Sequence, residues 1–217
     1  MQRPHPAAVL FDMDGLLIDS ERVAIAAMDV AAAHIDWIVP QAVGQKLIGL
    51  GRDGGRVVLR DALGEAFPLE AFWQAWQSEY LARVAEGVSA KSGALDALVA
   101  LRGAGIQAAV ATSTHTPHAL LKLEKAGLLA YFGAVVGREA VPNGKPAPDL
   151  YLEAARRLRV DAAHCWAFED SLPGLTAATR SGAKTHWVPD IAEVAHGDLP
   201  IGVERIDSLH EITRWIG

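Results

Sequence analysis

Two pairs of acidic residues, each directly after a short apolar run, could together bind a metal ion. Asp12 and Asp14 follow one such run, and Glu169 and Asp170 follow another. If both runs are parallel strands, the four carboxylates lie at one edge of the sheet, where α/β proteins bind ligands. Such a concentration of negative charge is costly unless a cation lies among it, and oxygen ligands suit Mg²⁺. The sequence therefore predicts a magnesium site, although the first pair alone also fits a turn and Asp170 alone also fits a helix cap.

Two further motifs could bind a phosphate group. Lys145 stands between Gly144 and Pro146 in a rigid turn, where its ammonium can neutralise both a phosphate and the carboxylate that attacks it. Thr112 and Ser113 follow another apolar run, and hydroxyl and backbone N–H groups ahead of a helix form an anion cradle. Taken singly, a lysine is usually a surface residue and a Thr-Ser-Thr run usually caps a helix. The convergence of all four motifs at one sheet edge favours the functional interpretation.

The elements that must position these motifs alternate in type along the chain. Short apolar runs, each ended by polar residues, glycine or proline, alternate with segments of helical periodicity. The runs are 8–11, 106–111, 134–136, 165–168 and 185–188, and the helical segments are 94–102, 117–126, 148–158 and 174–181. This alternation is typical of an α/β fold, here a Rossmann-like parallel sheet with helices on both faces.

The connection between the first two runs is too long for a single crossover. It spans roughly 95 residues, whereas a strand–helix–strand unit needs about 30. The additional residues have helical periodicity, and aromatic residues at 72, 73, 76 and 80 follow helical spacing, which predicts a core rather than a ligand site. We therefore expect residues 18–88 to form an inserted helical cap on an α/β catalytic core of residues 1–17 and 89–217, with hinges at both crossings.

The composition of the chain limits its partners. Of 217 residues, 51% are hydrophobic and 21% are charged, which is enough to bury one large core. No apolar stretch approaches the ~20 residues that span a bilayer, and a formal charge of -6 without a basic stripe argues against nucleic acid. The single cysteine, Cys165, cannot form an internal disulfide, which favours a cytoplasmic location. We expect no membrane or nucleic-acid partner, and a monomer or weak homo-oligomer.

One motif matches a cofactor pattern without its context. Residues 49–54 have the glycine spacing of dinucleotide-binding proteins, but they lie inside the helical insert and no strand pattern leads into them. Because that fingerprint works only between a strand and a helix, we expect no nucleotide cofactor.

Together the motifs resemble those of the haloacid dehalogenase superfamily of phosphotransferases. The resemblance covers nearly the whole chain, and its order and inserted cap are similar to the branch that contains β-phosphoglucomutase and small sugar-phosphate phosphatases. The residues that carry it are Phe11-Asp12-Met13-Asp14-Gly15, Ala111-Thr112-Ser113, Gly144-Lys145-Pro146-Ala147-Pro148-Asp149 and Phe168-Glu169-Asp170-Ser171.

The resemblance implies a role for each matched residue. It implies Asp12 as the nucleophile that forms an aspartyl-phosphate, Asp14 as the general acid and base, and Lys145 as a catalytic cation. Thr112, Ser113 and Lys145 would bind the phosphate. The Mg²⁺ ion would lie among Asp12, the Asp14 carbonyl, Glu169 and Asp170. The substrate would be a small phosphorylated metabolite such as a sugar phosphate.

The departures from this pattern bear on the choice between activities. Ala24 stands where the mutase has a cap-hinge histidine, which makes phosphosugar mutase activity the weaker alternative. Arg52 lies where the mutase cap contacts the non-reacting anionic part of its substrate, and a solvated surface arginine is an equal interpretation. A non-catalytic phosphate-binding protein is a third possibility, since a fold does not fix a function, but both Asp12 and Lys145 are present.

Overall fold

A six-stranded parallel sheet forms the centre of the larger part of the molecule. The structure, a computed structural model, describes residues 4–47, 52–191 and 194–216. Within these ranges the strand order is β3-β2-β1-β4-β5-β6. The strands are β1 (Ala8–Phe11), β2 (Gln107–Ala111), β3 (Ala134–Val136), β4 (Trp166–Glu169), β5 (Lys184–Trp187) and β6 (Glu204–Arg205). The predicted parallel α/β sheet is confirmed, and β6 is an addition that its two polar residues did not signal.

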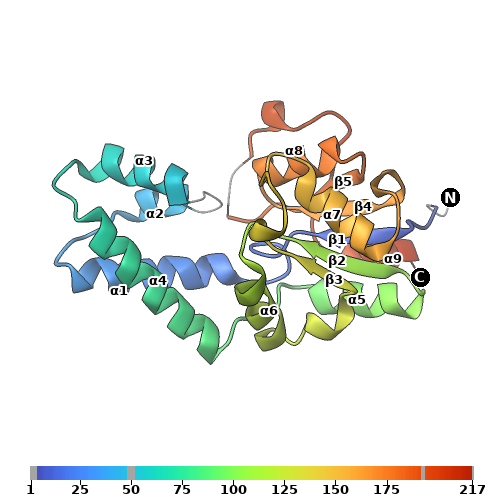
Figure 1. Ribbon diagram of the computed structural model, residues 1–217, viewed down its shortest axis with the longest axis horizontal. Coiled ribbons are helices and arrows are strands. Elements are labelled where there is room, and N and C mark those ends of the chain that lie inside the picture. Colours follow the sequence, from blue (N-terminus) through green and yellow to red (C-terminus); the bar gives the residue numbers. More distant parts are fainter. Residues whose placement is uncertain (1–3, 48–51, 192–193, 217) are drawn as a thin grey trace.

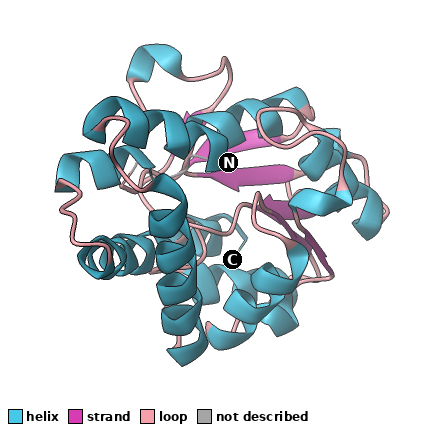
Figure 2. Cartoon of the chain, turned by 60° about the vertical axis from the view of Figure 1, so that its left-hand side comes forward, coloured by secondary structure: helices cyan, strands magenta, loops and turns pink. Residues whose placement is uncertain are grey.

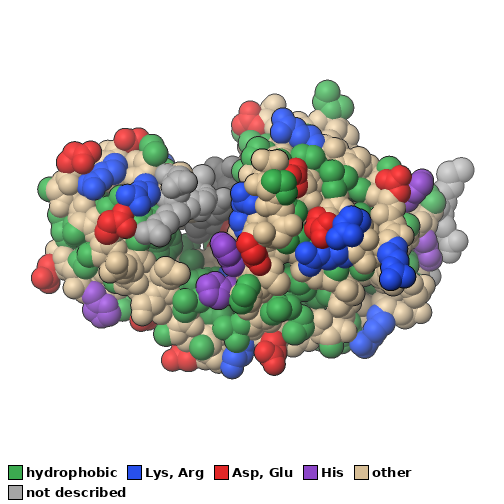
Figure 3. Space-filling model, viewed as in Figure 1, with side chains coloured by type: hydrophobic (Ala, Val, Ile, Leu, Met, Phe, Trp, Pro, Cys, Tyr) green, Lys and Arg blue, Asp and Glu red, His purple; other side chains and the backbone are tan. Residues whose placement is uncertain are grey.

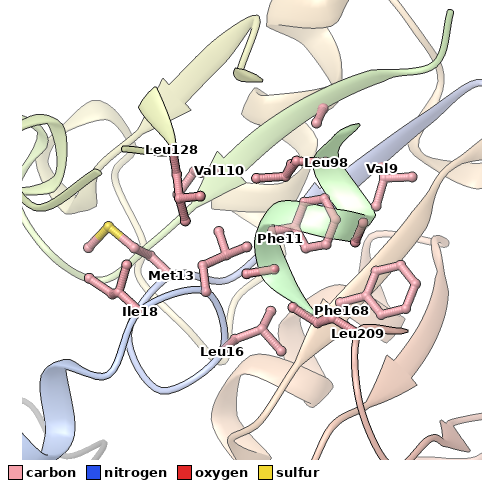
Figure 4. Close-up of a cluster of buried hydrophobic side chains, with 14 of the residues drawn as sticks. Val9, Phe11, Met13, Leu16, Ile18, Leu98, Val110, Leu128, Phe168 and Leu209 are labelled. Atoms are coloured by element: carbon pink, nitrogen blue, oxygen red, sulfur yellow. The ribbon is translucent and has the colours of Figure 1, made fainter. Parts of the chain in front are cut away.

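Helices cover both faces of this sheet (Figures 1 and 2). Alternate residues of each strand point to opposite faces, so Val9 and Phe11 of β1 lie in one apolar cluster while Ala8 and Leu10 lie in another. Figure 4 shows the first cluster, in which Phe11 lies near Leu98. The core helices are α5 (Ala94–Gly103), α6 (Thr116–Lys125), α7 (Asp149–Leu158), α8 (Leu172–Arg180) and α9 (His210–Ile216). Burial on both faces explains why the strands read as continuous apolar runs.

A separate group of helices is inserted between β1 and α5, as the long connection predicted. It contains α1 (Ser20–His34), α2 (Gln41–Leu47), α3 (Arg52–Leu63) and α4 (Leu69–Glu86), drawn at the left of Figure 1. These helices have their own apolar cluster, which includes Met28, Leu59, Phe67 and Phe72. The inserted helical cap is therefore confirmed, while its exact boundaries at 18 and 88 stay a prediction.

The two chain crossings into and out of the cap pair with each other. The backbone N–H of Asp19 donates to the carbonyl of Ser89 at 2.9 Å, and that of Lys91 donates to Leu17 at 2.9 Å. An antiparallel bridge joins Ile18 to Ala90 between them. Two short extended segments thus form the connection on which the cap would turn. In the described ranges, no helix is both long and apolar enough to cross a membrane.

Candidate active site

Asp12 lies at the carboxyl end of β1, buried beside Lys145. Its backbone N–H donates to the Phe168 carbonyl at 3.0 Å. This bond extends the pairing of β1 with β4 by one residue and so holds the backbone of Asp12 in place. The Lys145 ammonium donates to Asp12 Oδ1 and, at 2.5 Å, to Glu169 Oε1. Burial raises the pKa of Asp12 to about 7, against the opposing effect of Lys145. The lysine side chain, itself buried, is therefore held against both carboxylates.

Every carboxylate oxygen of Glu169 accepts hydrogen bonds. Oε1 accepts from Lys145 and from the Tyr151 hydroxyl at 2.8 Å. Oε2 accepts from the Ser171 hydroxyl at 3.0 Å and from the backbone N–H groups of residues 170 and 171. A fully buried carboxylate with this many donors is fixed in place and orients Lys145. Tyr151 was missed because it falls at an apolar position of a helix and reads there as a core residue.

Asp12, Glu169 and Asp170 form an acidic group at this sheet edge. One oxygen from each lies within 4.8 Å of the others. Asp170 Oδ1 is buried with no hydrogen-bond partner among the described residues. The Asp170 side chain packs directly against the backbone of Gly15. Only glycine fits there, since its φ is 83° and an added Cβ would lie 2.3 Å from Asp170 Oδ2. The orphaned oxygen and the all-oxygen donor set fit a hard cation such as Mg²⁺.

Asp14 lies beside this group and is held by a different set of side chains. Its oxygens accept hydrogen bonds from Ser20 at 2.6 Å, Thr114 at 2.7 Å and Lys122 at 2.7 Å. Burial alone would raise the pKa of Asp14, but the charge of Lys122 and these hydrogen bonds outweigh it and lower the pKa below its usual value. The Lys122 ammonium also lies 5.0 Å from the ring centre of Tyr80, a residue of cap helix α4. None of these partners of Asp14 was predicted.

The hydroxyl residues after β2 lie where the sequence placed them. Thr112 is buried, and its hydroxyl lies 3.5 Å from Asp14 Oδ2 and accepts from the backbone N–H of Thr114 at 3.0 Å. Ser113 is exposed and faces the cavity described below. The backbone turn after the strand is therefore already ordered around Thr112, with Ser113 open to a ligand.

A cavity of about 730 Å³ joins these residues between core and cap. Figure 3 shows the molecule hollowed between its two parts. Of the residues predicted for the site, the lining includes Asp12, Asp14, Thr112, Ser113, Lys145 and Asp170. Ala24 also lines it, and so does Tyr80, which helical spacing had wrongly assigned to the cap core. Arg52 begins α3, but its side chain and residues 48–51 lie outside the part that the structure describes.

Comparison with known proteins identifies the group to which this arrangement belongs. The family model of the haloacid dehalogenase-like hydrolases matches residues 6–182. The phosphorylated carbohydrates phosphatase of Thermotoga maritima is 33% identical over 175 residues, which cover 81% of each chain. The (DL)-glycerol-3-phosphatase 2 of Arabidopsis thaliana is 30% identical over 204 residues, 88% of this chain and 83% of that one.

A solved structure agrees with these sequence matches. CbbY from Rhodobacter sphaeroides, in complex with phosphate, superimposes with a TM-score of 0.78 at 28% identity over 96% of both chains. The predicted family and the predicted enzyme class, a hydrolase with phosphatase relatives, are confirmed. The chain belongs to the haloacid dehalogenase-like hydrolase family.

Proposed function

We propose that this enzyme hydrolyses the phosphomonoester of a small metabolite, with phosphorylated carbohydrates as the first candidates. The observation that carries the proposal is the buried pair of Asp12 and Lys145 on the wall of the cavity, with Asp14 next to it. The pair presents a carboxylate to an incoming phosphate while the lysine offsets the repulsion between the two anions. The names of the relatives in Thermotoga maritima and Arabidopsis thaliana support this substrate class.

In the first step, an Asp12 oxygen attacks phosphorus and the ester oxygen leaves. The P–O ester bond breaks as the Asp12–phosphorus bond forms, and Asp14 gives its proton to the departing alkoxide. A bound phosphate dianion near Asp14 disfavours its charged form and so helps it keep that proton. Thr112, Ser113 and Lys145 would hold the oxygens of the phosphoryl group during the transfer.

In the second step, water releases the phosphate from Asp12. Asp14, now a carboxylate, takes a proton from the water as its oxygen attacks phosphorus, and the Asp12–phosphorus bond breaks. Lys122 favours this charged form of Asp14. The residues fit Mg²⁺ held by Asp12, the Asp14 carbonyl and Asp170, with Glu169 beside them, and such an ion would offset the charge of the phosphoryl oxygens.

The test is phosphate release from a panel of sugar phosphates, glycerol 3-phosphate and p-nitrophenyl phosphate, with Mg²⁺ or with a chelator. We expect Asp12→Asn and the chelator each to abolish release, because one removes the nucleophile and the other the ion. Asp61→Asn, the same change at an exposed position of α3, is the matched control and should retain activity. Release that is independent of Asp12 on every substrate would refute the proposal.

The same assay distinguishes hydrolysis from a mutase reaction, in which the phosphoryl group is transferred back to another hydroxyl of the sugar. With glucose 1-phosphate, free phosphate supports the hydrolase and glucose 6-phosphate supports a mutase. Ala24 lines the cavity and has no group that can donate or accept a proton through its side chain, so we expect free phosphate.

A further inference from the structure

The segment that carries Lys145 is neither helix nor strand, so its backbone must be held by other means. It runs through residues 141–146, between β3 and α7. Among the described residues, more of the hydrogen bonds to this backbone come from side chains than from other backbone groups. The side chains that make these bonds are Arg138, Asp149 and Arg180. The place of Lys145 in the site therefore depends on them.

Arg138 contacts this segment at three points. Its Nη1 donates to the carbonyl of Val141 at 2.9 Å, and its Nη2 donates to that of Pro142 at 3.2 Å. The same side chain packs against Gly144, where an added Cβ would lie 2.7 Å from Arg138 Nε. Because a guanidinium is planar and its N–H groups have fixed directions, its bonds to two successive carbonyls restrict the segment more than a single ammonium would. Arg138 thus contacts the residue directly before Lys145.

Arg138 is itself tied to the loop after β2, the loop that was predicted to bind phosphate. Its backbone N–H donates to the carbonyl of Thr114 at 3.1 Å. Both of its neighbours bond to Thr116, since the N–H of Gly137 donates to the Thr116 hydroxyl at 3.2 Å and the Glu139 carboxylate accepts from the Thr116 N–H at 3.0 Å. A Cβ added at Gly137 would lie 2.3 Å from the Thr116 nitrogen, so the two backbones are in close contact. One short turn therefore joins the phosphate-binding loop to the segment of Lys145.

We propose that Arg138 is a positioning residue, which holds Lys145 at a fixed place relative to the phosphate-binding loop during the reaction. The inference rests on the proposed function, in which Lys145 offsets the charge of the phosphoryl group. Before the reaction, the Lys145 ammonium is also held by the carboxylates of Asp12 and Glu169. Once Asp12 is bonded to phosphorus it no longer carries a carboxylate charge, so its bond to the ammonium weakens. The contacts of Arg138 with the backbone do not change with the reaction and keep the lysine in place.

This role predicts which kinetic constant depends on Arg138. The substrate binds while the Asp12 carboxylate still holds Lys145, whereas both chemical steps form or break the bond between Asp12 and phosphorus. Loss of Arg138 should therefore lower kcat and leave KM near that of the wild type. A residue needed only for stability would change the fraction of folded enzyme and the urea midpoint instead.

The test measures kcat and KM with Mg²⁺ on the substrate, from the panel above, that releases phosphate fastest. We expect Arg138→Met to lower kcat by roughly 10- to 100-fold, because a misplacement of about 1 Å can cost that much, with little change in KM. Arg138→Lys keeps the charge but not the planar fork and should recover only part of kcat. Full recovery would mean that charge alone suffices and would overturn the inference. Arg156→Met, the same change at an exposed position of α7, is the matched control and should keep both constants.

Gly144→Ala tests the same contact from the other side. The added methyl group displaces the guanidinium without removing its charge, so kcat should fall while KM stays near that of the wild type. This variant keeps the inference testable if Arg138→Met folds poorly. In a Lys145→Met background, Arg138→Met should cause little further loss, since the two residues act together. An equal loss in both backgrounds would show that Arg138 does not act through Lys145.

Lys145→Met alone separates failure of this inference from failure of the proposed function. If Lys145→Met lowers kcat while Arg138→Met and Gly144→Ala keep the wild-type value, the inference is overturned and the proposed function stands. An unchanged kcat in Lys145→Met would overturn the role of Lys145 in the proposed function, and the role of Arg138 with it.

Discussion

Lys122 is the residue whose charge most directly controls Asp14. Its buried ammonium donates to Asp14 Oδ1 at 2.7 Å and favours the charged carboxylate. In Lys122→Met the burial of Asp14 remains but the opposing charge is lost, so the pKa of Asp14 should rise. Because the second step needs Asp14 as a base, the acidic limb of the kcat profile should move to higher pH, and activity should fall more at pH 6 than at pH 8.

Lys125→Met provides the control for this pH shift, since Lys125 is an exposed residue of the same helix. Its pH profile should match that of the wild type. An equal loss of activity at every pH in Lys122→Met would contradict the prediction and leave Lys122 with a purely structural role. The free energy of unfolding of Lys122→Met should also fall by about 1.5–3 kcal/mol, because Asp14 loses a charged hydrogen-bond donor.

The sequence predicted the residues that follow strand ends better than those that reach the site from helices. Asp12, Thr112 and Asp170 were located because a polar residue after an apolar strand stands out in the sequence. Lys122 and Glu21 lie inside helical patterns, where a charged residue reads as part of a solvated face. Only the packing of α1 and α6 at the sheet edge reveals that these two side chains are buried.

At the scale of elements, the start of α8 depends on a glycine that fits around Glu169. A Cβ added at Gly174 would lie 1.8 Å from Glu169 Oε1 and 2.0 Å from Glu169 Cδ. Gly174→Ala should therefore displace either the helix or the carboxylate and lower the free energy of unfolding by about 1–3 kcal/mol. Urea unfolding followed by circular dichroism measures the change, and phosphatase activity should fall with it because Glu169 orients Lys145.

The matched substitution is Gly103→Ala at the last position of α5, where an added Cβ meets nothing within 4 Å. It should leave stability unchanged or raise it by about 0.4–1 kcal/mol, since alanine restricts the unfolded chain. Equal urea midpoints for the two variants would show that the start of α8 tolerates the added methyl group.

The elements themselves were predictable wherever burial leaves a pattern in the sequence. Strands buried on both faces read as apolar runs, and the helices between them kept their periodicity. Tyr80 was assigned wrongly because helical spacing predicts which residues share one face of α4 but not which part of the protein packs against that face. The ring of Tyr80 contacts Lys122 of the core. The short strand β6 was missed because its residues, Glu204 and Arg205, are polar.

At the scale of the whole molecule, the separate apolar clusters of cap and core suggest two units joined by the paired crossings. Phe72 is fully buried in the cap cluster, while Cys165 is buried in one of the two apolar clusters of the core. Burial raises the pKa of the Cys165 thiol to about 11, so in the folded core it should react very slowly with a thiol reagent at pH 8. The labelling rate of Cys165 therefore reports opening of the core alone.

Phe72→Ala should cost the cap about 3–5 kcal/mol, whereas Leu101→Ala should cost the core about 2–5 kcal/mol. If cap and core open separately, Phe72→Ala should increase proteolysis within residues 18–88 and leave the Cys165 labelling rate near that of the wild type. Leu101→Ala, in the other apolar cluster of the core, should raise the labelling rate instead. Equal acceleration of labelling in both variants would mean that the molecule unfolds as one unit, and the assignment of 18–88 as an independent cap would then be wrong.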